Sequence, residues 1–199
     1  MWLSIIGHRS EPTDEELMSR YQGGEVQALG VLYDRYARRL QAFAWHQGAR
    51  RPEDVVQDAF MRVVRNGSSY KGNAKFKTWL FSIARNLCID ASRRDRFRIM
   101  PSLDQPVRDP DSQTLGDRVA DKTPAADASR ATEGSEFRAD LEVALAALPE
   151  EQREVFVLRQ ASGLAFAEIA KLTGSKENTV KSRMRYALQA LRAALADHI

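Results

Sequence analysis

The chain has 199 residues, of which 43% are hydrophobic and 29% are charged, and its formal net charge at pH 7 is +3. This length suits one domain or two small ones, and the composition is typical of a globular protein rich in helix. No apolar run approaches the roughly 20 residues that cross a bilayer, and residues 2–7 are too short for a signal peptide, which predicts a cytoplasmic protein without membrane insertion.

The sequence up to residue 99 contains four amphipathic helical patterns. Thr13-x-x-Glu16 is a capping-box signature that opens a short first helix, and Gly23-Gly24 ends it. The second pattern has apolar residues at alternating spacings of three and four, which predicts one buried stripe on a long helix: Val26, Leu29, Tyr33, Tyr36, Leu40 and Phe43.

Two more helices complete this part of the chain. Pro52 suits the first position of the third helix, whose expected inner side chains are Val55, Val56, Ala59, Phe60 and Val63. A fourth helix is expected from about residue 75, and its expected inner side chains are Trp79, Leu80, Ile83, Leu87 and Ala91. No strand-like alternation interrupts these patterns, so residues 1–99 are predicted to form an all-helical domain.

Residues 100–135 differ in composition, with four prolines, many Asp, Ser and Thr, and no aromatic residue. Such a segment cannot bury enough apolar area to offset the entropy lost on ordering. It is therefore interpreted as a flexible acidic linker between two small helical domains.

Helical spacing resumes in the second domain, residues 136–199. The first helix of this domain carries Phe137, Leu141, Leu145 and Leu148. Pro149 ends that helix and can head the next one, which carries Val155, Phe156 and Leu158. Two further helices are expected over 165–172 and 178–195, joined by Thr173-Gly174-Ser175-Lys176.

The last two helices have the features of a helix-turn-helix. Ile169, Ala170 and Leu172 form the inner face of the first, and Gly174 allows a left-handed turn. The second helix has a buried stripe of Val180, Met184, Ala187 and Leu188. Its outward side chains are of the types that reach phosphates and base edges in the major groove: Lys176, Asn178, Thr179, Lys181, Ser182, Arg183, Arg185 and Tyr186. A helical hairpin with a solvated basic face would show the same pattern.

The uneven distribution of charge favours DNA binding. Residues 62–98 contain ten Lys or Arg against two acids, residues 171–192 contain six against one, and residues 101–135 contain four against seven. Two basic segments around an acidic one are expected where two separate surfaces contact polyanions. Lys181 and Arg185 are the candidates for base contacts, because long donors reach guanine.

The single cysteine, Cys88, cannot form an internal disulfide, which agrees with a reducing compartment. It lies in an apolar helical pattern, which favours a core position over a reactive thiol. The three histidines and Cys88 are widely separated, and they lack the spacing of zinc ligands. We expect neither a metal ion nor a cofactor.

Three groups of residues together resemble the sigma-70 family of RNA polymerase sigma factors. Residues 148–156 (LPEEQREVF), 168–170 (EIA) and 179–183 (TVKSR) resemble the family's fourth conserved region. Residues 54–60 (DVVQDAF) resemble its core-binding region, and residues 76–86 (FKTWLFSIARN) resemble the segment that melts and recognises the promoter. The match is similar in order and separation to the extracytoplasmic-function (ECF) group, which has only these two domains.

The resemblance implies two contacts with promoter DNA. The second domain would recognise the minus-35 element as duplex through Lys181, Ser182, Arg185 and Tyr186, although many members have His-Arg where this chain has Arg185-Tyr186. The first domain would melt the minus-10 element and capture an exposed base in the loop before the fourth helix. The matching candidates are Ser69, Tyr70, Lys71, Gly72, Asn73, Lys75, Phe76, Arg85, Asn86, Arg93 and Arg94.

The residues alone leave the roles of the loop aromatics open. A loop that captures a single-stranded base needs cations, a stacking wall, and amide or hydroxyl groups that recognise a base edge. Tyr70 and Phe76 can either stack on a base or pack beneath the loop, while Trp79 is interpreted as a core residue.

Asp54, Gln57 and Asp58 lie one turn apart on the exposed side of the third helix, and an acidic patch suits a protein partner rather than DNA. The resemblance implies that this face, with Val55 and Phe60 nearby, binds the clamp of the largest subunit of core RNA polymerase. It also implies contact with the polymerase flap, and an anti-sigma factor as a further partner.

A free-standing repressor or activator is the main alternative, with the first domain as a dimerisation or ligand module. Such a protein needs neither the acidic face on the third helix nor the basic aromatic loop before Trp79. An enzyme acting on nucleic acid needs clustered carboxylates or a nucleophile in a pocket, and Asp54 and Asp58 have no identifiable third ligand. We therefore expect a sigma factor that is not an enzyme.

Overall fold

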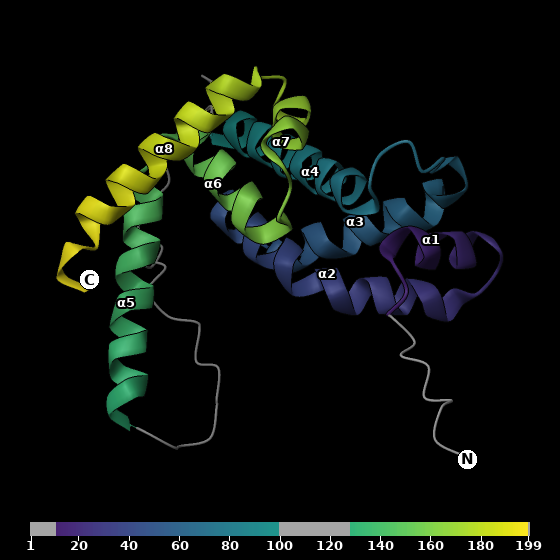
Figure 1. Cartoon of the computed structure of the whole chain (residues 1–199), viewed down its shortest axis with the longest axis horizontal. Helices are drawn as coiled ribbons and strands as arrows, with labels where there is room; N and C mark the ends of the chain where they lie inside the picture. The colour runs from purple at the N-terminus through teal and green to yellow at the C-terminus, as the bar shows by residue number, and fades with distance from the viewer. Residues whose placement is uncertain (1–10, 100–127, 199) are drawn as a thin grey trace, which may run out of the picture.

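The computed structural model describes residues 11–99 and 128–198, which form helices joined by short turns (Figure 1). The first range contains α1 (Asp14–Gln22), α2 (Val26–His46), α3 (Pro52–Asn66), the short 3₁₀ helix η1 (Gly67–Ser69) and α4 (Phe76–Ile99). The second contains α5 (Ala128–Ala147), α6 (Glu150–Ser162), α7 (Phe166–Thr173), α8 (Glu177–Ala194) and η2 (Ala196–His198). No strand occurs in either range, so the predicted all-helical fold is confirmed.

α1 and α3 begin where the sequence predicts. The Thr13 hydroxyl accepts a hydrogen bond from the Glu16 N–H at 3.2 Å, and Glu16 Oε2 accepts one from the Thr13 N–H at 2.8 Å. Pro52 is the first residue of α3, where its missing N–H removes no intrahelical bond. All five predicted inner side chains of α3 are buried.

The first half of α2 differs from its prediction. The stripe is correct from Tyr36 onward, but Val26 is 67% exposed and Tyr33 is 46% exposed, whereas Ala28 and Leu32 are buried. The exposed residues Val26 and Tyr33 and the buried residues Ala28 and Leu32 both have helical spacing. A search for large apolar side chains favours the first pair, because it does not count the small side chain of Ala28. The packing of α1 and α3 against α2 selects the row that is buried.

α4 is buried on more than its predicted side. Leu80, Ile83 and Leu87 are buried as expected, but Phe81 and Cys88 are buried as well. The reason is that α4 packs against α2 and α3 and also against α6 and α7. Cys88 is only 6% exposed, which confirms its assignment to the core, and this burial raises the pKa of its thiol to about 11.

α5 begins at Ala128, rather than at about residue 136 as predicted. The last proline of the segment is Pro124, so no proline after it interrupts a helix. The composition was averaged over residues 100–135, and this average hid the helix-compatible sequence after Pro124. The rest of the predicted linker, residues 100–127, lies outside the described residues.

The predicted helix-turn-helix is confirmed by α7, α8 and the turn between them. Gly174 has a φ of +66°, in the left-handed region that favours glycine. Ile169 and Ala170 are buried in α7, and the buried side chains of α8 are Val180, Met184, Ala187 and Leu191. The predicted burial of Leu188 is wrong: it is 36% exposed, because α5 packs on the row formed by Ala187 and Leu191.

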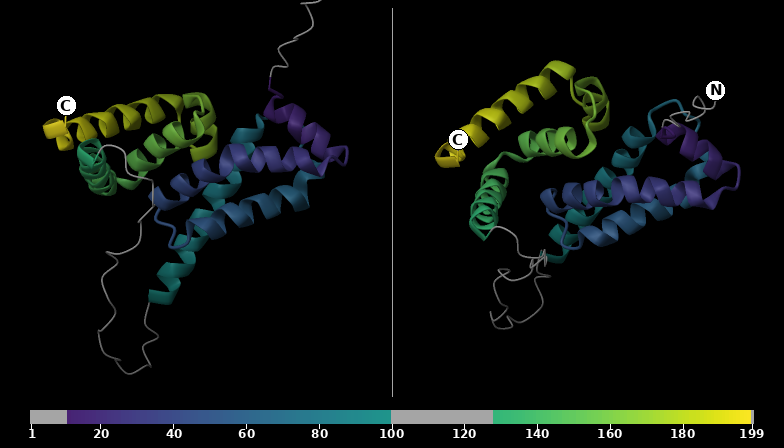
Figure 2. Two further views of the ribbon diagram at one scale, coloured as in Figure 1. Left: turned by 90° about the horizontal axis from the view of Figure 1, so that it is seen from below. Right: turned by 60° about the horizontal axis from the view of Figure 1, so that its bottom comes forward.

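α6 and α7 lie against α2 and α4 of the first part (Figure 2, left). α6 contacts α2 and α4, and α7 contacts α4. Leu158 of α6 and Ile169 of α7 belong to the same apolar cluster as Leu40 and Phe81. The two described parts therefore share one core, a contact that the sequence did not predict.

The corrected stripe of α2 predicts opposite effects for two apolar truncations. Leu32→Ala removes a fully buried side chain and is expected to lower the free energy of unfolding by about 2–5 kcal/mol. Val26→Ala, at an exposed position of the same helix, is expected to change it by less than about 0.5 kcal/mol. Urea denaturation followed by circular dichroism measures both, and a larger loss for Val26→Ala would contradict the observed packing.

Candidate nucleic-acid and polymerase interfaces

Six of the eight predicted minus-35 side chains form an exposed face at the start of α8: Lys176, Asn178, Thr179, Lys181, Arg185 and Tyr186. Ser182 is half-buried. The Arg185 guanidinium lies 5.0 Å from the centroid of the Tyr186 ring, and its Nη2 donates to the Tyr186 hydroxyl at 3.3 Å. Stacking on the ring limits the rotamers of Arg185 and leaves part of its planar fork available to a partner.

A groove along α8 extends this face. Lys181, Arg185 and Arg192 line the groove together with Met184 and Leu188. Three cations around apolar side chains suit a polyanion whose sugars and methyl groups also contact the protein. The exposed Leu188 belongs to this groove, and Arg192 is a contributor that the sequence analysis missed.

Arg183, the remaining candidate, is turned toward α6. Its Nη1 donates to Ser175 Oγ at 2.9 Å, and its Nη2 pairs with Glu151 Oε2. Its side chain is only 21% exposed. Arg183 thus ties the turn of the helix-turn-helix to α6, and the structure gives no support to the predicted outward orientation.

The loop between η1 and α4 contains five of the eleven predicted minus-10 residues: Tyr70, Lys71, Gly72, Asn73 and Lys75. Lys71, Gly72, Asn73 and Lys75 are exposed, and Gly72 has a φ of +70°. Ser69 is also exposed, and its hydroxyl donates to the Asn66 carbonyl at 2.7 Å. These groups form a cationic, polar loop at the surface.

Three aromatic side chains lie beneath this loop. The Tyr70 ring centroid is 5.1 Å from that of Trp79, and the Phe76 centroid is 6.1 Å from each of the others. Phe76 is fully buried, so it supports the loop and cannot stack on a base as the prediction allowed. Tyr70 and Trp79 are partly buried, so their exposed edges are available to a base.

The Tyr70 hydroxyl forms a hydrogen bond across the loop. It donates to the Ala74 carbonyl at 2.7 Å. Burial, with the nearby charges of Glu15 and Asp14, raises the pKa of Tyr70 to about 12, so the phenol stays protonated near neutral pH and this donor is retained.

The predicted DNA-binding side chains within α4 after Phe76 divide into two groups. Arg85 Nε lies 2.6 Å from Glu154 Oε1 of α6, and the two side chains are 21% and 15% exposed. Asn86, Arg93 and Arg94 are exposed on the same helix. Arg85 is therefore paired within the protein, while the other three can contact a nucleic acid directly.

Two more hydrogen bonds join α4 to the second part of the chain. Lys77 Nζ donates to the Gly163 carbonyl at 3.1 Å, and Thr78 Oγ1 donates to Glu168 Oε1 at 3.0 Å. With the Arg85–Glu154 pair, these contacts form what we call the interdomain clasp. Glu154 and Glu168 were not predicted from the sequence, because their partners are 69 and 90 residues away along the chain.

The pKa of Glu168, one of the two clasp carboxylates, is lowered, which favours its ionised form. Burial raises the pKa of this carboxyl, but hydrogen bonds from the Ala165 N–H and the Thr78 hydroxyl, with Lys75 and Lys77 nearby, lower it by more. The net direction is downward. A carboxylate at this position holds the start of α7 and contacts α4 at the same time.

The predicted polymerase-binding residues occupy two sides of α3. Gln57 and Asp58 are exposed and Asp54 is half-exposed, with its Oδ2 3.3 Å from Arg51 Nε. Val55 and Phe60 are each only 7% exposed and belong to the core, so they support this face rather than form it. The exposed apolar side chains nearby are Tyr33, Met61 and Val64. Met61 and Val64 lie off the predicted inner stripe of α3, which could have identified them in the sequence, whereas Tyr33 was wrongly assigned to the buried stripe of α2.

Within residues 11–99 and 128–198, no group of three or more His, Cys, Asp or Glu side chains is placed to hold a metal ion. Of the helices in these ranges, none is both long enough and apolar enough to cross a membrane.

Comparisons with known proteins match both parts of the chain. The family model described as Sigma-70 region 2 matches residues 32–98, and the one described as Sigma-70, region 4 matches residues 138–191. SigL, an ECF RNA polymerase sigma factor of Mycobacterium tuberculosis, is 34% identical over an alignment of 187 residues, and the match covers 90% of this chain and 97% of SigL. BldN, an ECF RNA polymerase sigma factor of Streptomyces coelicolor, is 30% identical over an alignment of 189 residues, and the match covers 92% of this chain and 66% of BldN.

A solved structure shares the fold over most of the chain. It is the sigma factor RpoE from Bartonella quintana in complex with the anti-sigma factor NepR. RpoE is 26% identical to this chain, with a TM-score of 0.61, and the match covers 85% of this chain and 95% of RpoE.

The Arg85–Glu154 pair is predicted to stabilise the contact between the two parts of the chain. A double-mutant cycle of Arg85→Ala and Glu154→Ala is expected to give a coupling free energy of about 1–3 kcal/mol, because each charge is mostly buried against the other. Urea denaturation of the four proteins measures this coupling.

The exposed pair Lys181–Glu177, with an N–O distance of 2.7 Å on α8, provides a matched control. Its coupling is expected to be about 0.3–0.5 kcal/mol. A coupling free energy for Arg85–Glu154 no larger than this value would show that the clasp does not stabilise the contact between the two parts of the chain, which we call the closed arrangement.

Proposed function

Because the chain belongs to the ECF group of sigma-70 family RNA polymerase sigma factors, we propose that it binds core RNA polymerase in the cytoplasm and directs promoter-specific initiation without catalysing a reaction itself. One observation carries this proposal. The matches to regions 2 and 4 fall on the two parts of the chain that present separate cationic faces, the loop before α4 and the start of α8.

The start of α8 binds the minus-35 element as duplex DNA in this proposal. Lys181 and Arg185 are exposed on the groove-lining side of the helix, where long donors can reach the acceptors of guanine in the major groove. Lys176, Asn178 and Thr179 lie at the helix N-terminus, where backbone N–H groups and the dipole also favour a phosphate.

The loop before α4 captures a base of the melted minus-10 strand. Lys71 and Lys75 can neutralise phosphates, and Asn73 offers both a donor and an acceptor to a base edge. The Tyr70 ring provides a stacking surface beside these polar groups.

The exposed side of α3 binds the clamp of the polymerase. Its charges, Asp54 and Asp58, lie beside the exposed apolar side chains of Met61 and Val64, a mixture that suits a protein interface better than DNA. The second part of the chain binds the flap. Since RpoE was solved with the anti-sigma factor NepR, we propose that an anti-sigma factor also controls this chain.

The clasp must open before both promoter elements can be bound. The elements lie about 25 base pairs apart, which is about 85 Å along B-form DNA. A compact protein of this size has a radius of gyration of about 16 Å, so the two DNA-binding faces cannot reach both elements while α4 and α6 are in contact. Opening also frees Arg85 from Glu154 for the promoter strand.

Removing the cations of α8 is predicted to reduce promoter selection. Lys181→Ala combined with Arg185→Ala should lower initiation by about tenfold or more at a promoter selected from a genomic library, since each base contact contributes about 1–3 kcal/mol. In vitro transcription with core polymerase measures this effect. Arg138→Ala, which removes an exposed cation from α5, should leave promoter selection unchanged. If the wild-type chain binds duplex DNA tightly by itself and directs no specific initiation, a repressor function replaces this proposal.

Reversing a charge on α3 is predicted to weaken binding to core polymerase. Asp54→Lys should weaken binding to core polymerase about tenfold or more, because a like charge in an electrostatically matched interface costs several kcal/mol. Fluorescence anisotropy of the labelled chain with core polymerase measures the affinity. Glu136→Lys on α5 is the matched charge reversal and should bind like the wild type. Equal losses for the two variants would exclude the α3 face as the docking surface.

A further inference from the structure

α1 lies outside both segments matched by the family models, yet it contacts both ends of the loop before α4. No function was predicted for it from the sequence. The hydrogen bonds to the loop come from two side chains, Gln22 at the end of α1 and Glu15 in its first turn.

Gln22 holds the beginning of the loop. Its Nε2 donates to the Gly67 carbonyl at 2.8 Å and to the Tyr70 carbonyl at 2.8 Å. One side-chain amide thus fixes two backbone positions, on either side of Ser69. A Cβ atom at Gly67 would lie 3.1 Å from Tyr21 Cε1, so the backbone here approaches α1 closely.

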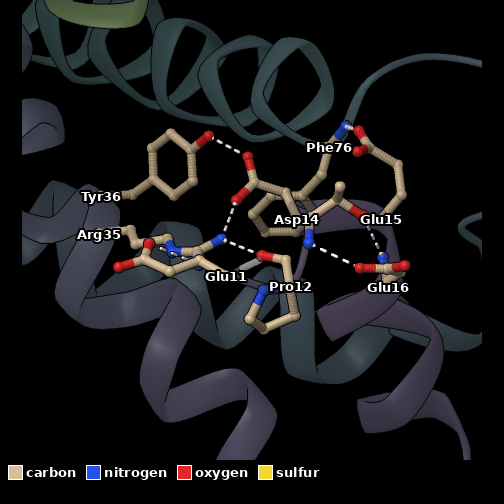
Figure 3. Close-up of polar contacts among 9 residues, drawn as sticks. Glu11, Pro12, Asp14, Glu15, Glu16, Arg35, Tyr36 and Phe76 are labelled. Carbon is tan, nitrogen blue, oxygen red and sulfur yellow. Dashed lines mark hydrogen bonds and ion pairs between the residues drawn. The ribbon is translucent and has the colours of Figure 1, made fainter. Parts of the chain in front are cut away.

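Glu15 holds the other end of the loop, as Figure 3 shows. Its Oε1 accepts a hydrogen bond from the Phe76 N–H at 2.9 Å. Phe76 is the first residue of α4, and its N–H has no partner within the helix. The carboxylate therefore caps α4 and fixes the residue at which the loop ends.

α1 is itself held firmly against α2 (Figure 3). Asp14 accepts a hydrogen bond from the Tyr36 hydroxyl and pairs with Arg35 Nη1 at 2.9 Å. Arg35 Nη1 also donates to the Pro12 carbonyl at 2.8 Å. With Leu17 and Met18 of α1 buried in the core, the helix is a fixed support rather than a mobile segment.

We propose that Gln22 and Glu15 are positioning residues that determine minus-10 specificity by fixing both ends of the base-capturing loop. The proposal rests on the proposed function of that loop. The middle of the loop is exposed and contains Asn73, whose orientation toward a base depends on where the two ends are held. Recognition of a base edge requires placement to within about 0.5 Å, so releasing one end changes which bases fit.

The test uses the full chain in holoenzyme. A promoter is first selected from genomic DNA by the wild-type holoenzyme, and its minus-10 and minus-35 positions are then changed one base at a time. Initiation rates on this set are measured for Gln22→Ala, Gln22→Glu, Glu15→Ala and Glu15→Gln. Gln27→Ala, an exposed glutamine of α2, is the matched control, and Asn73→Ala reports on the loop itself.

Gln22→Ala and Glu15→Ala are expected to reduce discrimination among minus-10 bases about two- to tenfold, the effect of one or two lost hydrogen bonds. Gln22→Glu should reduce it at least as much, because a carboxylate oxygen would face two carbonyls. Glu15→Gln keeps an oxygen acceptor for the Phe76 N–H and should retain most of the discrimination. Discrimination at the minus-35 element should stay unchanged in all of them.

A merely structural role gives a different pattern. If Gln22→Ala and Glu15→Ala leave minus-10 discrimination intact, or lower initiation by one factor on every promoter variant, while Asn73→Ala shifts the preference, the positioning role is wrong and the proposed function stands. If Asn73→Ala also leaves minus-10 preference unchanged, the loop does not recognise this element. The proposed function of the loop then fails together with the inference.

Discussion

The burial of α4 on two sides is the constraint on which the rest of the structure depends. Its apolar side chains face α2 and α3 as well as α6 and α7, so Phe81 and Leu158, which are far apart in sequence, lie in one cluster. A helix buried in this way has little surface left for polar groups. Of the polar side chains that remain, Arg85 is paired across the interface, Asn86 is exposed in the middle of the helix, and Arg93 and Arg94 are exposed near its C-terminal end.

If Arg85 binds the promoter strand as proposed, the closed arrangement, in which the clasp is formed, competes with promoter DNA for this side chain. Arg85 can be neutralised by Glu154 or by a phosphate, and the apolar contact of α6 with α2 and α4 must be lost when the two parts separate. Burial of apolar area stabilises the closed form by about 25 cal/mol for each Å². DNA contacts are strengthened by counterion release and depend on salt, whereas the apolar contact does not. Binding of the α3 face and the second part of the chain to separate polymerase subunits would supply the free energy that shifts this balance.

The sequence predicted what depends on local spacing. The inner side chains of α3, the capping box of α1 and the left-handed turn at Gly174 all follow from patterns within a few residues, and the structure confirms them. The predictions were wrong where the packing of a neighbouring helix determines which of two sets of side chains with helical spacing is buried, as for Leu188 and the first half of α2. The contacts of Gln22 and Glu15 were not predictable, since they join groups 45 to 61 residues apart and leave no periodic signal.

The support of the loop from its two ends explains why its centre can be open. A loop that packed through its own central side chains would be rigid, but those side chains would then be unavailable to a base. Here the fixed points are the backbone at Gly67, Tyr70 and Phe76, and the Tyr70 hydroxyl adds a bond to the Ala74 carbonyl. All of these bonds engage backbone groups, so Asn73 and the two lysines remain exposed. In the proposed positioning role, minus-10 specificity depends on α1, a helix that need not contact the DNA.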